Sequence, residues 1–229
     1  AFTALALIWG DNGVVMKIAL VYIGPIDFAY LRVAFGTLLL FLVLLGIRAP
    51  LKPRHVGKTA LVGLCQTTGF VGLISLALVY GETGRSAVLA YTMPFWVIAL
   101  GWPFLRERLH GAQWPAVALA LAGLVLVLEP WNRGAGLVGS LLALAAAALW
   151  AVSVIIVKRI PIDGRAELLS LTAWQMVFGW VPLAVLALVV PERPIEWSPP
   201  FIAALVYNGI GGMALATLLW LYILQRLPA

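Results

Sequence analysis

The stretch "LLALAAAALWAVSVIIV", Leu141 to Val157, contains no charged residue and no alternation of polar with apolar positions. The whole chain is 63% hydrophobic and only 10% charged, whereas a soluble domain carries about 25% charged residues. Only helices and closed barrels satisfy their backbone in lipid, and barrel strands alternate between apolar and polar residues. An apolar run of this length without alternation is typical of a membrane helix, so the sequence predicts an all-α membrane protein.

Clusters of turn-forming and charged residues divide the chain into eight predicted transmembrane helices. The first ends at about residue 21, and the others cover about 26–47, 59–80, 86–105, 112–128, 137–157, 168–190 and 201–224. The loops after the second, fourth, sixth and eighth helices carry ten Lys and Arg residues, against three in the loops after the third, fifth and seventh. The positive-inside rule therefore predicts a multi-pass protein of the inner (plasma) membrane with a cytoplasmic N-terminus.

The formal net charge of +6 comes largely from these loops. It is explained by membrane topology, so we expect the lipid bilayer as a partner and no nucleic acid. We also expect a monomer. Cys65 is the one cysteine, which excludes a disulfide within the chain.

The chain also contains a weak internal repeat. Trp9 recurs as Trp150 at an offset of 141 residues, and "AFG", ending at Gly36, returns as "VFG", ending at Gly179, at an offset of 143. A repeat unit of five helices is odd in number, so the second copy enters the membrane from the opposite side, as in many secondary transporters. We therefore expect a first repeat at residues 1–130 and an incomplete second repeat at 137–229. Two further helices after residue 229 would bring the complete chain to ten.

Three segments resemble the EamA-type drug/metabolite transporters. "LIWGDNGVVMKIAL" resembles their first helix, "FAYLRVAFGTLLLFLVL" resembles their second, and residues 91–128 carry the family pattern of Pro94, Glu107 and Gly123. The resemblance implies ten helices in two inverted five-helix repeats and export of small metabolites without ATP hydrolysis. The nearest group is the amino-acid exporters of the YddG type. The second copy of the Pro–Glu–Gly segment is missing from this sequence.

Candidate substrate-binding residues lie near the middle of the predicted spans. Trp9 and Asn12 share one helix face at i, i+3, and Trp150 and Ser153 repeat that spacing. Tight helix packing and the lining of a cavity both remain open for them. Pro94 favours a kink beside Tyr91, which would free backbone carbonyls for a ligand. Aromatic rings and a few polar groups suit a small amphipathic substrate; the complete set is Trp9, Asn12, Tyr80, Tyr91, Pro94, Trp150, Ser153, Trp174 and Gln175.

Two charged residues need a separate explanation. Asp11 is the one carboxylate near the middle of a predicted helix, and it lies about 200° around that helix from Trp9. An acid within the membrane needs a partner or water. We hypothesise that Asp11 pairs with Arg32; a role as a proton relay is the alternative.

The sequence contains neither an HExxH nor a Walker motif, and His55 and His110 both fall in loops. We therefore expect no enzyme activity, no cofactor and no metal site. The predicted function is a secondary transporter that exports small amphipathic metabolites, with aromatic or other neutral amino acids as the first choice, by alternating access between inverted repeats. One alternative is an exporter of drugs or other metabolites by proton antiport. A membrane channel is another, although no helix carries a continuous polar stripe.

Overall fold

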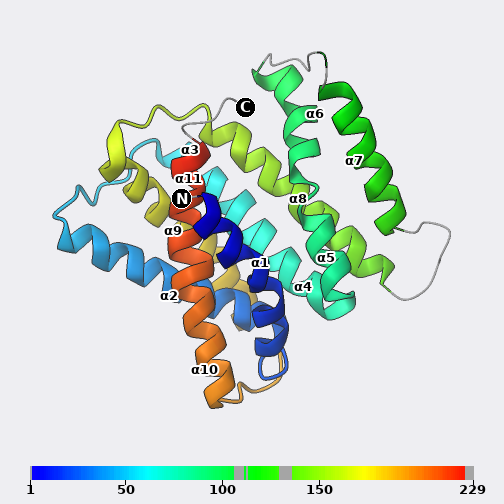
Figure 1. Cartoon of the computed structure of the whole chain (residues 1–229). Helices are drawn as coiled ribbons and strands as arrows, with labels where there is room; N and C mark the ends of the chain where they lie inside the picture. Colours follow the sequence, from blue (N-terminus) through cyan, green and yellow to red (C-terminus); the bar gives the residue numbers. More distant parts are fainter. Residues whose placement is uncertain (1, 106–110, 112, 129–135, 225–229) are drawn as a thin grey trace.

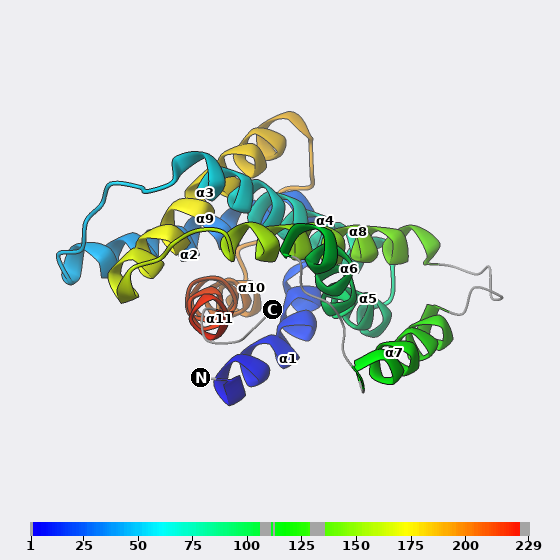
Figure 2. The same ribbon diagram turned by 90° about the horizontal axis from the view of Figure 1, so that it is seen from above.

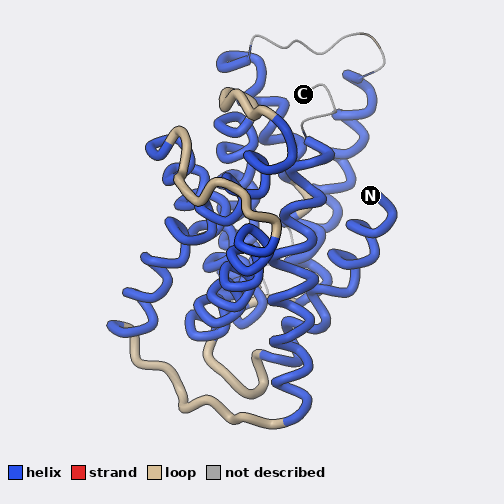
Figure 3. The backbone as a smooth tube through the Cα atoms, turned by 90° about the vertical axis from the view of Figure 1, so that its left-hand side faces the viewer, coloured by secondary structure: helices blue, strands red, loops and turns tan. Residues whose placement is uncertain are grey.

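The structure is a computed structural model that describes residues 2–105, 111, 113–128 and 136–224. Within these ranges the regular elements are all helices, joined by turns and loops (Figure 3). The prediction of an all-α chain is therefore confirmed for the described residues. Glu107, which carries part of the family pattern, lies outside them.

The helices follow the apolar runs of the sequence closely. The predicted helix over residues 137–157 is found with the same bounds. In chain order the elements are α1 (Phe2–Ala19), α2 (Pro25–Gly46), α3 (Val56–Val62), η1 (Gly63–Val71), α4 (Gly72–Tyr80), α5 (Thr83–Ala90), α6 (Met93–Leu105), α7 (Gln113–Leu128), α8 (Leu137–Val157), α9 (Gly164–Val189), α10 (Pro199–Val206), η2 (Tyr207–Leu215) and α11 (Ala216–Leu224). The segments η1 and η2 are π-helical turns, and each continues the α-helices on either side of it.

The predicted helix over 86–105 is divided in two. It breaks at a turn of two residues, Tyr91 and Thr92, between α5 and α6. Pro94 lies in the first turn of α6, where its missing N–H leaves no helical hydrogen bond unmade. The Thr92 hydroxyl donates to the carbonyl of Leu89 at 2.7 Å and closes the end of α5. The expected kink is therefore a complete break, placed just before the proline.

Among the described residues, five continuous helices are long and apolar enough to cross a membrane. They are Pro25–Gly46, Val56–Tyr80, Leu137–Val157, Gly164–Val189 and Pro199–Ile223. Each has at least 21 residues, which matches the thickness of the hydrocarbon core. The count of eight spans remains a prediction.

Helix α8 crosses the middle of the molecule and packs against α3, η1, α4, α5 and α6 (Figure 1). Helix α2 packs along α9 and η2, while α1 runs beside α10, η2 and α11. Seen from above, α1 and α7 lie to one side of the layer formed by α2, α9, α4 and α8 (Figure 2). Helices from the first part of the chain thus pack directly against helices from its last part.

Two helix crossings depend on glycine. On α2, a Cβ added at Gly36 would lie 2.7 Å from Met213 Cβ and 3.1 Å from the carbonyl oxygen of Gly209 in η2. On α9, a Cβ added at Gly179 would lie 2.3 Å from Thr67 Cβ and 2.5 Å from the carbonyl oxygen of Gly63 in η1. In lipid, helices associate through van der Waals packing, and small residues permit this close approach.

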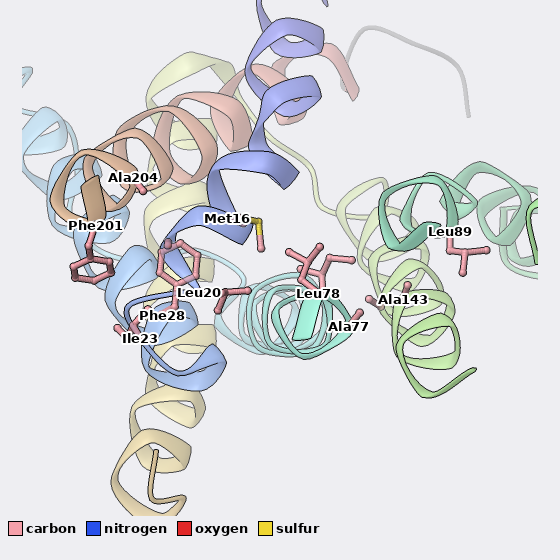
Figure 4. Close-up of a cluster of buried hydrophobic side chains, with 13 residues drawn as sticks. Met16, Leu20, Ile23, Phe28, Ala77, Leu78, Leu89, Ala143, Phe201 and Ala204 are labelled. Carbon is pink, nitrogen blue, oxygen red and sulfur yellow. The ribbon is translucent and has the colours of Figure 1, made fainter. Parts of the chain in front are cut away.

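Buried apolar side chains join the first helices to the last. Phe28, Phe201, Ile23 and Leu78 are at most 2% exposed. Figure 4 shows them in one cluster, with Met16 pointing from α1 toward Leu78 of α4. This cluster holds α1, α2, α4 and α10 together beside the cavity described below.

A polar corner links the α9–α10 loop to the turn between α1 and α2. The Glu192 carboxylate accepts the backbone N–H of Ile26 at 3.1 Å and that of Asp27 at 2.9 Å. Arg193 donates to the carbonyl oxygens of Leu20 and Ile23. Glu192 therefore satisfies donors at the N-terminus of α2, and Arg193 satisfies acceptors just after α1.

Candidate functional site

A cavity of about 130 Å³ lies between the early and late helices. This is close to the size of an apolar cavity that holds a benzene molecule. Its walls come from both halves of the chain, including α1, α2, η1, α8, α9 and η2. The lining residues are Trp9, Gly10, Asn12, Gly13, Met16, Arg32, Gln66, Thr67, Phe70, Val71, Ile74, Leu78, Ala87, Ala90, Tyr91, Met93, Trp150, Gln175, Met176, Gly212, Met213 and Thr217.

One wall of the cavity is aromatic. The ring centroid of Trp150 lies 5.1 Å from that of Trp9 and 4.2 Å from that of Phe70, both in edge-to-face geometry. Trp220 extends this cluster, 5.8 Å from Trp9. Such contacts fix the rings in place and present both ring faces and edges to a ligand. Trp150 is only 7% exposed, so it forms the buried base of this wall.

Several residues that line the cavity carry a buried polar atom without a hydrogen-bond partner. Four of its lining residues carry one: Asn12 Oδ1, Arg32 Nε, Trp150 Nε1 and Gln175 Oε1. Buried polar atoms are almost always paired in folded proteins, and exceptions call for an explanation. Two donors and two acceptors on residues that line one small space provide the hydrogen-bonding groups for a polar ligand.

Glycine makes room for one of these groups. A Cβ added at Gly212 in η2 would lie 2.9 Å from Asn12 Oδ1. The amide nitrogen of Asn12 lies 3.4 Å from Met16 Sδ, one turn along α1. The Asn12 side chain is therefore held against η2 with its oxygen unpaired.

Of the predicted substrate-binding residues, the structure brings five to this cavity. These are Trp9, Asn12, Tyr91, Trp150 and Gln175. They come from four different parts of the chain. Helical spacing links Trp9 with Asn12, and the repeat links Trp9 with Trp150.

The other four predicted residues lie elsewhere. Tyr80 is 57% exposed at the end of α4, and Pro94 is exposed on α6. Ser153 is buried behind the lining, where its hydroxyl lies 2.6 Å from the carbonyl oxygen of Trp150. Trp174 donates to the carbonyl of Leu51 at 2.8 Å and lines a separate groove beside the loop at residues 50–55. A polar or aromatic residue within a span thus has several possible environments that its sequence position cannot distinguish.

The hypothesised Asp11–Arg32 pair is wrong. Asp11 is exposed on α1, whereas Arg32 is buried and has other partners. In the described part of the chain the one ion pair found joins Arg54 to Glu167, at 3.1 Å. The reason is rotational: Asp11 points away from the Trp9 face of α1, and Arg32 points into the cavity.

Several lining residues were not among the predicted site residues. Gln66 and Thr67 lie in the π-helical segment η1, and Thr217 lies in α11. Their polarity inside an apolar span was a usable signal, because polar groups in lipid prefer interior faces. Phe70 gave no such signal, since an aromatic residue is common on any face of a membrane helix.

One family model matches nearly the whole chain. A family model described as the EamA-like transporter family matches residues 1–129 and 137–229. A solved structure, titled only as the crystal structure of a protein, has a TM-score of 0.72 with 22% identity and covers 98% of this chain and 77% of its own. That likeness shows a shared fold.

The similar proteins are transporters with differing names. The uncharacterized transporter YoaV of Bacillus subtilis is 26% identical over 99% of this chain and 79% of its own length. A probable amino-acid metabolite efflux pump of Escherichia coli is 30% identical over 81% of this chain and 62% of its own. A riboflavin transporter of Rhizobium johnstonii is 31% identical over 54% of this chain and 38% of its own.

Proposed function

Because this chain belongs to the EamA-like transporter family, and is a multi-pass membrane transporter rather than an enzyme, we propose that it exports small amphipathic metabolites. The substrate class is amino acids, with aromatic or other neutral ones first. The similarity to a probable amino-acid metabolite efflux pump supports this class.

The observation that carries the proposal is the composition of the cavity. The lining combines an aromatic wall of Trp9, Phe70 and Trp150 with Asn12 and Gln175, whose side-chain oxygens are buried without a hydrogen-bond partner. An apolar group of the substrate would pack on the rings, and its polar end would satisfy the unpaired donors and acceptors. A purely apolar ligand would leave those atoms unpaired, and an inorganic anion would gain nothing from the ring faces.

Transport by alternating access between inverted repeats is part of the proposal. The two π-helical segments support it, since each has nine residues and their starts, Gly63 and Tyr207, are 144 positions apart. The two glycine crossings support it further, because Gly36 and Gly179 are 143 positions apart and each contacts the π-helical segment of the other half. The excess of basic residues in alternate loops supports a cytoplasmic N-terminus and an inner-membrane location.

A second candidate is proton-coupled antiport of drugs or other metabolites. The similarity to a riboflavin transporter favours a wider substrate range. Asp11 would be the proton-binding group in that case, but it is exposed on α1 and does not line the cavity. Facilitated export without such a group is therefore the function that the cavity supports best.

The test is counterflow in liposomes that contain the purified protein and a panel of radiolabelled amino acids. Saturable uptake stimulated by the same substrate on the opposite side is expected, and it should fall at least about tenfold with Trp9→Ala because a stacking wall is lost. Asp11→Asn is the matched control two residues away and should transport normally. A non-saturating flux would indicate a channel, and loss of transport in Asp11→Asn alone would indicate proton coupling.

A further inference from the structure

The cavity contains one charge among its described lining residues, the guanidinium of Arg32. Arg32 lies in the second turn of α2 and is 2% exposed. A buried charge in a membrane protein is costly unless it is paired, and such residues mark functional sites. The partners of this guanidinium therefore decide what the site can bind.

Each hydrogen-bond acceptor around Arg32 is neutral. Nη1 lies 3.0 Å from the thioether sulfur of Met16 and 3.4 Å from Asn208 Oδ1. Nη2 lies 3.3 Å from Ser75 Oγ and 3.4 Å from the carbonyl oxygen of Val71. A thioether is a weak acceptor, and the oxygen contacts are long for a charged donor. Nε has no partner at all.

No carboxylate compensates this charge within the cavity. The described lining contains neither Asp nor Glu. Asp11, the acid that the sequence placed nearest, is exposed on another face of α1. The Phe28 ring lies with its centroid 5.3 Å from the guanidinium carbon, a cation–π contact. The guanidinium thus has no counter-ion beside a space that can admit a ligand.

The helix crossing itself does not require this charge. Position 175 on α9 is related to position 32 on α2 by the same offset of 143 that relates Gly179 to Gly36. Gln175 occupies it, is 1% exposed and lines the same cavity. A neutral amide therefore suffices where α9 crosses η1, and a structural need for Arg32 is not evident from its counterpart.

We propose that Arg32 is the anion-binding pole of the cavity and that the ligand is a small monocarboxylate with an apolar or aromatic end. The inference rests on the proposed function for its transport context and specifies the substrate class of that same cavity. Planar guanidinium groups match carboxylates in geometry and can bind both oxygens. Nε of Arg32 is buried and has no hydrogen-bond partner within the described protein.

The placement of Arg32 and of the aromatic cluster around Trp9 suits one such molecule. Arg32 contacts Met16, and the aromatic cluster contains Trp9, which precedes Met16 by seven residues on α1. Seven residues of helix rise by about 10 Å, so the Arg32 contact and the aromatic cluster lie about two turns apart along α1. The carboxylate would meet Arg32 while the ring packs near Trp9.

The charge of the cavity makes a further distinction among ligands. With no described acidic lining residue, an ammonium group would find ring faces and neutral amide and hydroxyl oxygens but no carboxylate. The carboxylate should therefore dominate recognition. An acid that lacks the amino group should bind at least as tightly as the amino acid, and an amine of the same skeleton should bind poorly.

The experiment measures binding to the purified protein in detergent by quenching of tryptophan fluorescence. The probes share one skeleton: 3-phenylpropionate, L-phenylalanine, 3-phenylpropylamine and 3-phenylpropanol. We expect 3-phenylpropionate to bind about 10- to 100-fold more tightly than the amine or the alcohol, the range expected for charged hydrogen bonds. Equal or tighter binding of the amine or the alcohol, or no binding of any acid, would overturn the inference without the use of any variant.

Variants then assign the effect to one residue. Arg32→Gln, the residue found at position 175, should abolish the preference for the acid over the alcohol. Arg32→Lys should keep part of it, because it retains the charge but loses the planar fork. Arg165→Gln, an exposed residue in the first turn of α9, is the control and should leave the preference unchanged. A preference that persists in Arg32→Gln would refute the role of Arg32.

This result is separable from the test of the proposed function. Acid binding that depends on Arg32, without counterflow of any amino acid, would uphold the anion-binding pole and refute amino-acid export. Amino-acid counterflow with no preference for the acid in binding would uphold export and refute the anion-binding pole.

Discussion

The crossing of α2 with η2 resembles the crossing of α9 with η1 in its glycine packing. The two crossings differ in the charge of the polar residue beside them. Each places a Phe-Gly pair against a π-helical segment: Gly36 faces Gly209, and Gly179 faces Gly63. The polar residues beside them differ in charge. On α2 the cavity receives the guanidinium of Arg32, and on α9 it receives the amide of Gln175.

The shared glycines therefore serve helix packing, and the difference in charge concerns ligand recognition. Glycine at both crossings lets backbones approach closely, so both halves need it. Charge is present at one crossing alone, so the cavity has a positive side and a neutral side. Two similar helix crossings thereby form a cavity whose two sides differ in charge.

Gln175→Arg would give the two crossings the same charge and has the largest expected effect. A second guanidinium would be buried in the same cavity without a counter-ion, and we expect the free energy of unfolding to fall by about 3–5 kcal/mol. Titration with SDS in mixed micelles measures this loss. Gln175→Met, similar in length and uncharged, should cost less than about 1.5 kcal/mol. Equal losses in the two variants would show that charge is not the cause.

Gly179→Ala tests the tighter of the two crossings. The new Cβ would lie 2.3 Å from Thr67 Cβ and 2.5 Å from a backbone oxygen, so α9 must move away from η1. We expect a loss of about 1–3 kcal/mol, as for other overpacked cores. Gly46→Ala at the end of α2 has nothing within 4 Å of its Cβ and should be neutral or slightly stabilising.

Gly36→Ala tests the looser crossing. Its Cβ would meet Met213 Cβ at 2.7 Å and the oxygen of Gly209 at 3.1 Å, which are longer distances than those at Gly179. We therefore expect destabilisation in the same SDS titration, smaller than for Gly179→Ala. A larger loss at Gly36 would reverse the ranking of the two crossings.

Glu192→Gln has the smallest expected effect. It tests the hydrogen bonds at the N-terminus of α2, which differ from those at the N-terminus of α9. The N-terminus of α2 is capped by Glu192 from a distant loop, whereas Glu167 in the first turn of α9 accepts the N–H of Asp163 at 2.6 Å, four residues away. Loss of the negative charge at the α2 dipole should cost about 0.3–1 kcal/mol. The shift in melting temperature in detergent measures it, and Glu196→Gln in the same loop serves as the control.

The helices were predictable because their cause is local. An uncharged apolar run such as 137–157 must be helical in lipid, whatever surrounds it. The break before Pro94 was only partly predictable, since proline disfavours the preceding helix but packing decides whether a kink or a break results. The π-helical form of η1 and η2 gave no signal in the sequence.

The candidate site was predictable where a helix face could be inferred. Trp9 and Asn12 share a face by spacing, and both line the cavity. Trp174 and Gln175 are neighbours in the sequence, yet one lines the loop-side groove and the other the cavity. Adjacent residues on a helix point about 100° apart, so composition alone could not decide between them.

By itself, the sequence determined that the chain lies in lipid and which segments are helical, in which order. The apolar runs and the charge-rich loops between them are local features, so they can be read without knowledge of the tertiary contacts. Only the tertiary structure decided that Asp11 lies outside and that Arg32, with no acidic partner, lies inside. That outcome depends on how α2 is rotated against η2 and η1, through contacts of Arg32 with residues 176 and 39 positions away. A charge on an apolar helix is costly on either side of it, and the contacts across the bundle determine which side it takes.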